Sequence, residues 1–260
     1  MITSITNDRV QYVSLLQTQR RARRKANQFV IEGVKLSVEA LDNNAPVDEV
    51  FYTLDFANSD TGTALLDRFS RAGARLMAVD EAVMQHISDT QTPQGILAVL
   101  PTFSPPLPES PEFILVIDGI ADPGNMGTIM RTAVGAKVPL VIVTAGTVDL
   151  LNPKVVRSAM GAHFYLPVTQ MSWEGMASRF SDHAFFLASV GNGTPYYRVN
   201  WTQPSALIVS EEAHGASSEA TRLAHVHVTI PIERIESLNV AMATGILLFE
   251  RQRQLADALH

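Results

Sequence analysis

The residues best suited to chemistry follow a short apolar run, FILVI, at 113–117. The next stretch, 118–137, crowds three glycines and a proline into one turn and then places Arg131 inside an apolar, helix-like segment. A guanidinium is buried in proteins only when it is paired. Arg131 therefore either makes a structural pair with Asp118, Asp122 or a carbonyl, or grips an anionic ligand. This motif alone leaves the two interpretations level.

Two other apolar strands also run into polar, loop-tolerant residues. The strand at 206–210 enters an acidic loop that contains Glu212, and a later loop presents Ser237 and Asn239 at the start of an apolar helix. We expect Ser237 and Asn125 to be the N-caps of their helices. Loops at the carboxyl ends of parallel strands form the ligand site of an α/β domain. The sequence thus predicts one site that contains Asn125, Arg131, Glu212, Ser237 and Asn239.

Common nucleotide and metal motifs are absent from the sequence. The clustered glycines are spaced G-x4-G-x2-G, which departs from the dinucleotide pattern G-x-G-x-x-G, and neither a Walker sequence nor G-x-S-x-G occurs. His225 and His227 alternate along a predicted strand, but no HExxH, cysteine or paired carboxylate spacing accompanies them. We therefore expect no metal site.

Composition indicates a globular chain in a reducing compartment. Its 260 residues, 46% hydrophobic and 18% charged, suffice for one large or two ordinary domains. The chain contains no cysteine, which excludes disulfides, thiolate metal sites and a cysteine nucleophile. Because no apolar stretch reaches membrane-spanning length and the N-terminus lacks the layout of a signal peptide, we expect a cytoplasmic protein with no membrane partner.

A proline-rich stretch, TFSPPLPESPE at 102–112, divides the chain. It is predicted to be an extended linker between a domain at 1–101 and a domain at 113–260. The first domain alternates helix-like segments with expected strands at QFVIEG, VDEVFYT, RLMAV and GILAVL. In the second, helical segments separate strands that lack polar alternation: FILVIDG, PLVIVTA, HAFFLASV, SALIVS and HVHVTI. The expected fold class is α/β, with a parallel sheet covered on both faces in the second domain.

Positive charge is concentrated near the N-terminus. Residues 1–45 contain seven Lys or Arg against four Asp or Glu, whereas the whole chain has a net charge of −6. Five of these cations end a predicted helix at 10–25, namely Arg20, Arg21, Arg23, Arg24 and Lys25. Such a cluster either contacts phosphates or forms a solvated helix face, and the charge run alone leaves both possibilities open.

Taken in order, these motifs resemble the SpoU, or TrmH-like, branch of the SPOUT RNA methyltransferases. The first motif of that family has an asparagine, a glycine two residues later and an arginine four beyond it, which here are Asn125, Gly127 and Arg131. NPKVVRSAMGAHFYLPV at 152–168 is similar to the second motif. IPIERIESLNVAMATGILLFE at 230–250 is similar to the latter part of the third.

The first half of the third motif departs from the family pattern. Ser210 stands where glycine is usual, and Ala213 replaces a second glycine. Because glycine lets a backbone approach a ligand closely, Ser210 is expected to tighten the pocket or to weaken binding. The N-terminal segments at 5–41 and 92–100 resemble the ribosomal-protein-like RNA-binding extension of the family.

The resemblance implies methylation of ribose 2′-hydroxyls in RNA with S-adenosylmethionine, by a homodimer whose C-terminal domain contains a trefoil knot. It implies that backbone groups of the loops at 208–215 and 228–239 hold the cofactor, in a pocket lined by Val209, Ser210, Gly215, Ile230, Pro231 and Leu238. Arg131 is expected to orient the RNA and stabilise a developing alkoxide, because a guanidinium is a poor general base at neutral pH. The sequence leaves open whether it acts as the base. Asn125 would fix the loop of the arginine, and the neighbouring polar groups or proton acceptors would be Glu212, Ser237 and Asn239.

RNA recognition would belong to the basic N-terminal domain, with phosphate contacts from the cations at 20–25. Analogy favours ribosomal RNA as the substrate, and transfer RNA is the alternative within the enzyme class. The alternative from another class is a non-catalytic RNA-binding dimer of the same fold, which the departures at Ser210 and Ala213 support.

Overall fold

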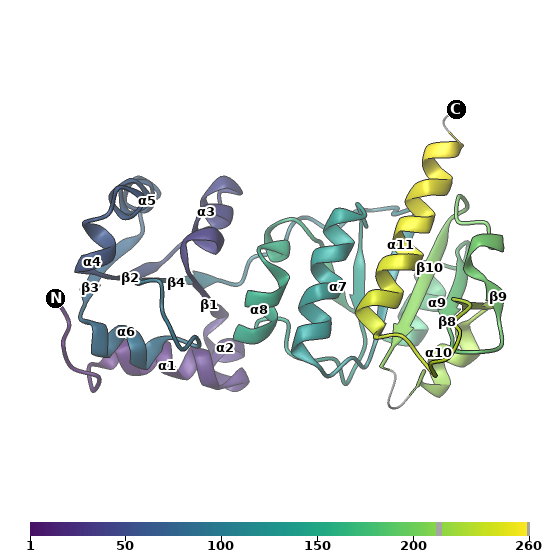
Figure 1. The fold of residues 1–260 in the computed structure, drawn as a ribbon, viewed down its shortest axis with the longest axis horizontal. Helices are drawn as coiled ribbons and strands as arrows, with labels where there is room; N and C mark the ends of the chain where they lie inside the picture. Colours follow the sequence, from purple (N-terminus) through teal and green to yellow (C-terminus); the bar gives the residue numbers. More distant parts are fainter. Residues whose placement is uncertain (212–214, 259–260) are drawn as a thin grey trace. The chain divides into compact units, whose positions relative to one another are not determined.

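The structure, a computed structural model, describes residues 1–211 and 215–258. Its chain divides into two compact units (Figure 1). Unit 1 consists of Met1–Phe103 together with Asp149–Tyr165, and unit 2 consists of Ser104–Val148 and the described residues from Leu166 onward. The segment at 149–165 therefore packs with the N-terminal elements, although the sequence-based limits assign it to the second domain. Those limits remain a prediction about which segments fold on their own.

Unit 1 has a mixed sheet between two layers of helices. The sheet order is β1-β4-β2-β3, in which only β2 and β3 run parallel. The strands are β1 (Gln28–Glu32), β2 (Glu49–Thr53), β3 (Arg75–Val79) and β4 (Ile96–Pro101), so every strand expected in this region is present. The helices are α1 (Asp8–Thr18), α2 (Arg20–Ala26), α3 (Val34–Asp42), α4 (Leu54–Ala57), α5 (Asp60–Arg71), α6 (Glu81–Ile87) and α8 (Pro153–Ala159), with a 3-10 turn η1 at Ala162–Phe164.

Alternation along the strands of unit 1 fills both of its cores. Phe29 and Ile31 of β1 pack with α3, α4 and α5, whereas Val30 of the same strand packs with α1 and α6. This follows from the period of two along a strand, and Figure 1 shows the two helix layers on opposite faces. The helix expected at 10–25 is in fact two helices, because Gln19 adopts an extended backbone (φ −120°, ψ 114°) between α1 and α2.

Unit 2 is built on a parallel sheet. The described strands have the order β7-β6-β5-β10-β8-β11-β9, and each neighbouring pair among them is parallel. They are β5 (Phe113–Asp118), β6 (Val141–Val143), β7 (Val168–Gln170), β8 (Ala184–Ala188), β9 (Thr194–Pro195), β10 (Ser205–Ser210) and β11 (Val226–Thr229). The five expected strands are confirmed, and the two short strands β7 and β9 were not predicted.

Helices cover both faces of this sheet, as the unbroken apolar strands predict. They are α7 (Pro123–Gly135), α9 (Trp173–Arg179), α10 (Ser218–Leu223) and α11 (Val240–Asp257), with a 3-10 turn η2 at Tyr196–Arg198. Ile114 and Val116 of β5 pack in the core that includes Met176 of α9 and Ala220 of α10. The opposite face meets α11, where the Arg251 guanidinium lies 4.3 Å from the ring centre of Phe113. Helices α7 and α11 lie side by side (Figure 1).

Candidate active site

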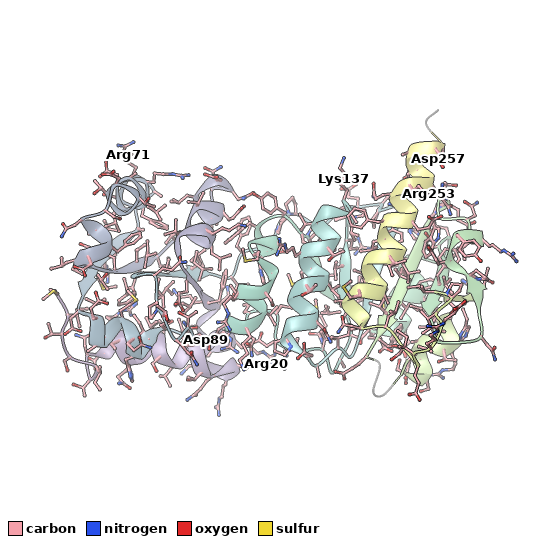
Figure 2. The ribbon with its side chains drawn as sticks, viewed as in Figure 1. Arg20, Arg71, Asp89, Lys137, Arg253 and Asp257 are labelled. Carbon is pink, nitrogen blue, oxygen red and sulfur yellow. The ribbon has the colours of Figure 1, made fainter. Side chains whose placement is uncertain are left out.

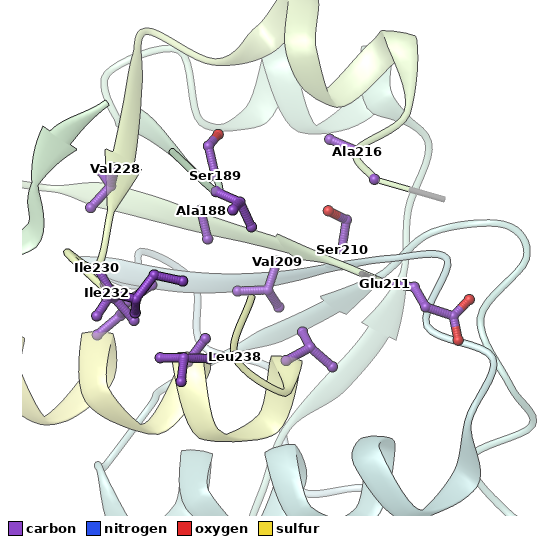
Figure 3. Close-up of a pocket in the computed structure, with 15 residues that line it drawn as sticks. Ala188, Ser189, Val209, Ser210, Glu211, Ala216, Val228, Ile230, Ile232 and Leu238 are labelled. Atoms are coloured by element: carbon purple, nitrogen blue, oxygen red, sulfur yellow. The ribbon is translucent and has the colours of Figure 1, made fainter. Parts of the chain in front are cut away.

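A cavity of about 330 Å³ opens in unit 2 at the carboxyl ends of β8, β10 and β11 (Figure 3). This is the place where a parallel α/β sheet is expected to bind its ligand. The loops after the three strands and the first turns of α11 line it: Ala188, Ser189, Val190, Val209, Ser210, Glu211, Gly215, Ala216, Val228, Ile230, Ile232, Leu238, Val240, Ala243 and Leu247.

Most of the predicted cofactor residues line this cavity. Val209, Ser210, Gly215, Ile230 and Leu238 are all in its wall. Pro231 is exposed and lies between two lining residues without being one itself. Glu212 and Ala213 fall outside the described residues. The cofactor roles assigned from the sequence remain predictions, and the geometry supports most of them.

The wall of the cavity is apolar on one side and polar on another. Figure 3 shows the side chains of Ile230, Ile232 and Leu238 gathered at one side, with Ser210 and Glu211 at the other. Gly215 has a positive φ of 68°, a conformation that residues with a Cβ rarely adopt. A mostly apolar cavity with a few placed polar groups is typical of a small-molecule site.

A hydrogen bond between two predicted catalytic residues joins the starts of α7 and α11. The Asn239 Nδ2 donates to the Asn125 Oδ1 over 2.8 Å. Asn239 directly follows Leu238, which lines the cavity. The sequence prediction that these strand ends converge is therefore confirmed for Asn125 and Asn239.

Both predicted N-caps are wrong. Helix α7 begins at Pro123 and its cap is Asp122, whose carboxylate accepts from the Asn125 backbone N–H over 2.7 Å. Helix α11 is capped by Asn239, whose Oδ1 accepts from the N–H groups of the first turn. Proline suits the first helical position, so α7 begins at Pro123 and its cap lies three residues before Asn125. Ser237 is exposed and lies in the loop before α11.

Arg131 lies on the exposed side of α7. Gly124, Thr128 and Gly135 are exposed on the same helix and, with Arg131, recur at the helical period. Arg131 is about 9 Å along the helix axis from Asn125, given the rise of 1.5 Å per residue. Among the described residues its guanidinium has no hydrogen-bond or ion-pair partner, so the structural pairing with Asp118 or Asp122 that the sequence left open does not form.

Asp118 is a residue that the sequence reasoning considered only as a partner for Arg131. It is the last residue of β5, is 7% exposed and lies beside Ser210 in the strand register. Its carboxylate accepts from the Ser217 backbone N–H over 2.7 Å and from the Thr144 hydroxyl over 3.4 Å. Asp118 thereby ties the segment that follows Gly215 and Ala216 of the cavity wall to the centre of the sheet.

The turn after β8 was also missed. Ala188, Ser189 and Val190 line the cavity, and the Ser189 hydroxyl lies 3.0 Å from the His227 Nδ1. The sequence reasoning treated the adjacent GNG at 191–193 as a plain turn. The strand-end rule, applied to this third strand as well, would have found these residues.

The cluster of cations on α2 in unit 1 divides into two kinds. Arg20, Arg21, Arg24 and Lys25 are exposed. Arg23 is 3% exposed, and its guanidinium donates to the Asp149 carboxylate over 2.9 and 2.6 Å and to the Leu16 carbonyl over 2.7 Å. The structure does not favour the prediction that Arg23 contacts RNA, because this arginine faces the interior of unit 1 and its guanidinium is already paired.

No described helix is long and apolar enough to cross a membrane. No group of three or more His, Asp or Glu side chains within 1–211 and 215–258 is arranged to hold a metal ion.

Comparison with known protein families identifies the fold of both parts. A family model described as the SpoU rRNA Methylase family matches residues 112–249, which is more than half of the chain. The chain belongs to the SpoU rRNA methylase family. A model described as the MRM3-like substrate binding domain matches residues 7–98.

Curated relatives match along nearly the whole chain. The 23S rRNA (guanosine(2553)-2′-O)-methyltransferase RlmP of Bacillus subtilis is 31% identical over 252 residues, which cover 95% of this chain and 97% of RlmP. The human mitochondrial rRNA methyltransferase 3 is 30% identical over 313 aligned residues, which cover 95% of this chain and 72% of that protein.

Solved structures of related methyltransferases superpose on both units. An AdoMet-bound rRNA methyltransferase from Sinorhizobium meliloti has a TM-score of 0.86 at 28% identity, covering 98% of this chain and 97% of that one. The SpoU methyltransferase AviRb from Streptomyces viridochromogenes, solved in complex with AdoMet, has a TM-score of 0.84 at 26% identity, covering 96% of this chain and 100% of that one. The resemblance stated from the sequence motifs is confirmed.

Proposed function

We propose that this protein transfers a methyl group from S-adenosylmethionine to a ribose 2′-hydroxyl of ribosomal RNA. It belongs to a family of rRNA methylases, and its relatives include enzymes named for this reaction. The observation that carries the proposal is the cavity at the strand ends, joined through Leu238 and Asn239 to the start of the helix that bears Arg131.

The residues of the cavity fit S-adenosylmethionine. Its volume of about 330 Å³ lies at the lower end of the range for small-molecule sites. Ile230, Ile232 and Leu238 supply an apolar side suited to a purine ring, and the loop backbone near Gly215 and Ser210 supplies polar groups. We assign binding of this ligand to these residues and to Val209 and the bend at Pro231. When bound, S-adenosylmethionine supplies an electrophilic methyl group on a positively charged sulfur.

Arg131 is the residue that we assign to the reacting ribose. Methyl transfer forms a bond between the 2′-oxygen and the methyl carbon as the carbon–sulfur bond breaks, and the hydroxyl proton leaves. An exposed guanidinium with no partner among the described residues can donate to the ribose oxygen or the adjacent phosphate and stabilise the developing negative charge. Asn125 and Asn239 hold the start of α7 against the cavity wall. Ser237 and Glu212 remain the candidates for accepting the proton, and no step assigned to these residues requires a metal.

RNA binding is assigned to unit 1. Its residues 7–98 match a substrate-binding domain, and α2 presents Arg20, Arg21, Arg24 and Lys25 to solvent. Guanidinium and ammonium groups grip phosphates without reading bases, so this helix would provide affinity rather than sequence choice. We place the reaction in the cytoplasm, which suits a chain that contains no cysteine.

We also propose a homodimer formed through α7 and α11. Met242 and Phe249 are 63% and 54% exposed and recur two turns apart on one face of α11. The Phe249 ring lies 3.9 Å from the position where a Cβ on Gly135 of α7 would stand, so the absence of a side chain keeps this surface flat. Exposed apolar side chains gathered on one face favour a protein interface. Within each copy, we propose that the segment from β11 to α11 passes through a neighbouring loop and forms a trefoil knot, in line with the family fold.

Light scattering tests the dimer directly. Wild-type protein should elute with twice the mass of the chain, and Met242→Glu together with Phe249→Glu should elute as a monomer. Ser178→Glu, which adds charge at an exposed position of α9 outside the proposed interface, is the control and should elute as the dimer. A wild-type monomer at micromolar concentration would contradict this part of the proposal.

Loss of one ribose methyl group in a deletion strain tests the function. We expect one ribosomal RNA nucleotide to lose its 2′-O-methyl group and to regain it when the purified protein and S-adenosylmethionine are added to the unmodified RNA. Methylation of transfer RNA but not of ribosomal RNA would show that transfer RNA is the substrate. No calorimetric binding of S-adenosylmethionine at millimolar concentration would favour the non-catalytic RNA-binding dimer.

A further inference from the structure

A second cavity lies wholly within unit 1 and shares no lining residue with the site above. Its volume is about 220 Å³. The end of α1, the turn between β1 and α3, the segment at 89–94 and helix α8 surround it. Its apolar wall is formed by Val30, Leu36, Pro153, Val156 and Met160.

The side-chain amide of Gln94 is held through its oxygen, and its NH2 group has no protein partner among the described residues. The Gln94 Oε1 accepts from the Val34 backbone N–H over 2.9 Å. Gly33 has a φ of 92°, which residues with a Cβ rarely adopt, and a Cβ there would stand 2.7 Å from this oxygen and displace the Gln94 amide. Within the described part of the chain the Gln94 Nε2 has no partner, and both of its hydrogens are available.

The side-chain amide of Gln17 is held through its NH2 group instead. The Gln17 Nε2 donates to the Ile87 carbonyl over 3.1 Å, and the Gln17 Oε1 is buried with no partner among the described residues. Buried acceptors without a partner are rare in proteins, because they lose water without compensation. The Gln17 oxygen has almost no accessible surface, so it lies behind the wall and not in the open cavity. The cavity itself offers the fixed donor of Gln94, which is an exposed residue, and the carboxylates of Glu32 and Asp89 as acceptors.

The charges around the cavity do not suit an anion. Lys35 and Arg157 line it, but so do Glu32 and Asp89, and Asp89 forms an ion pair with Arg157. The Glu32 carboxylate in turn accepts from the Ser88 hydroxyl over 2.5 Å and from the Asp89 backbone N–H over 3.1 Å. With two acids against two cations, a free phosphate gains little here.

We propose that this cavity binds one unstacked nucleobase of the RNA substrate. The edge of a base offers a donor and an acceptor side by side, and its faces are apolar enough to lie against Val30, Leu36 and Val156. The inference rests on the proposed function, which makes RNA the substrate. It adds that unit 1 recognises a base, whereas the cations of α2 bind only phosphates.

The cations of α2 belong to the same unit as this cavity. Gln17 precedes α2 by only a few residues, and Figure 2 shows Arg20 and Asp89 toward one side of unit 1, with Arg71 of α5 toward the other. A strand whose phosphates meet α2 can thus place a splayed base in the cavity.

Gln94→Glu tests the base contact by RNA binding. The substitution keeps the oxygen that accepts from Val34 and replaces the free donor with an acceptor. We expect the full-length protein to bind ribosomal RNA transcribed in vitro about 5- to 10-fold more weakly, the loss of one hydrogen bond to a fixed group. Gln91→Glu adds the same charge three residues away at an exposed position outside the cavity and should change affinity less than 2-fold. Equal weakening by the two variants would overturn the proposal.

Chemical shifts of the backbone amides locate the contact without RNA. Each of the four nucleoside 5′-monophosphates, at millimolar concentration, is added to the labelled full-length protein, with ribose 5-phosphate as the base-free probe. At least one nucleotide should shift the amides of Gly33, Val34 and Gln94 while ribose 5-phosphate does not. Equal shifts of these amides with ribose 5-phosphate, or no shift with any nucleotide, would overturn the proposal of a base site.

These outcomes are separable from failure of the proposed function. If wild-type protein methylates ribosomal RNA and Gln94→Glu behaves like Gln91→Glu, the enzyme assignment stands and the base site falls. If wild-type protein neither binds ribosomal RNA nor methylates it, the assignment of the substrate falls first.

Discussion

Helices α2 and α7 each contain an arginine that the sequence marked for contact with RNA, and the two have opposite environments. Arg23 of α2 is 3% exposed and bound on several sides by Asp149 and backbone carbonyls. Arg131 of α7 is exposed, with no partner among the described residues. A satisfied guanidinium stabilises a fold, whereas an unsatisfied one beside a cavity is available to a substrate. The comparison predicts that the two arginines respond to substitution in opposite ways.

The largest effect is expected for Arg131→Ala. Removing one fixed donor to a developing negative charge costs about 100- to 1,000-fold in turnover. The variant should bind S-adenosylmethionine with nearly unchanged affinity by calorimetry and unfold like the wild type. Lys137→Ala removes an exposed cation just after the same helix and should retain activity. Full methylation by Arg131→Ala, measured with labelled cofactor, would contradict the assignment.

Arg23→Met should instead lower stability. It leaves Asp149, whose side chain is 15% exposed, without its cation, which costs about 3 kcal/mol of the free energy of unfolding of unit 1. Both tryptophans, Trp173 and Trp201, belong to unit 2, so hydrogen exchange of β1 amides is the measurement that follows unit 1. The salt dependence of RNA binding should not change. A flatter salt dependence would show that Arg23 meets phosphate after all.

The exposed cations of α2 should respond through affinity and salt. Replacing Arg20, Arg21, Arg24 and Lys25 together by glutamine should weaken RNA binding at least 10-fold near 0.1 M salt. Each single change should lower the slope of log K against log salt by about 0.7, the value for one phosphate contact to a single strand. Arg71→Gln, an exposed arginine of α5 in the same unit, is the matched control and should leave the slope unchanged.

Asp118→Asn is expected to act on cofactor affinity alone. A neutral amide oxygen accepts more weakly from the Ser217 N–H than a carboxylate does, so the wall near Gly215 and Ala216 is held less firmly. We expect KM for S-adenosylmethionine to rise about 5-fold with kcat changed less than 2-fold. Asp122→Asn, in which an equally good N-cap residue replaces the cap of α7, should alter neither. An equal fall in kcat would assign Asp118 to the chemical step instead.

The smallest effect concerns His163. Burial lowers the pKa of its imidazole below the usual 6.5, although its Nε2 lies 2.8 Å from the Leu150 carbonyl. The unfolded chain therefore binds a proton before the folded chain does, and stability that is present above pH 6.5 is lost as the pH falls below it. The free energy of unfolding of unit 1 should therefore fall between pH 7.5 and pH 5.5.

His163→Phe should flatten that dependence, and hydrogen exchange of β1 at the two pH values measures it. The ring of Phe29 stacks on His163, so phenylalanine keeps most of the packing. His86→Gln, at an exposed position of α6, should leave the dependence as in the wild type. An unchanged slope in the phenylalanine variant would show that another group titrates.

Several elements of the fold were predictable because their signals are local. FILVI at 113–117 and ALIV at 206–209 are apolar at every position, and this composition already predicts strands of a covered parallel sheet, in which β5 and β10 are neighbours. Leu238 and Ser210 were expected from the family motifs to line the cofactor pocket, and both line the cavity.

The predictions that were wrong or missing concern features that depend on where the backbone turns into a helix or on a partner far away in the sequence. Asn125 and Ser237 are residue types that favour N-caps, but α7 is capped three residues earlier, at Asp122, and α11 two residues later, at Asn239. Asp118 gave no local sign that it would accept from Ser217, which is 99 residues away.

Sequence by itself determined the apolar strands, the helical segments between them, the cationic cluster and the family motif that contains Arg131. These are local properties, since a side chain and its near neighbours set the preference for strand, helix or solvent. Only the tertiary structure decided that Asp149 comes back to neutralise Arg23, that Asn239 meets Asn125, and that Gln94 and Asp89 line one cavity. Burial and pairing depend on which distant groups the folded chain brings into contact, and that information is spread over the whole sequence.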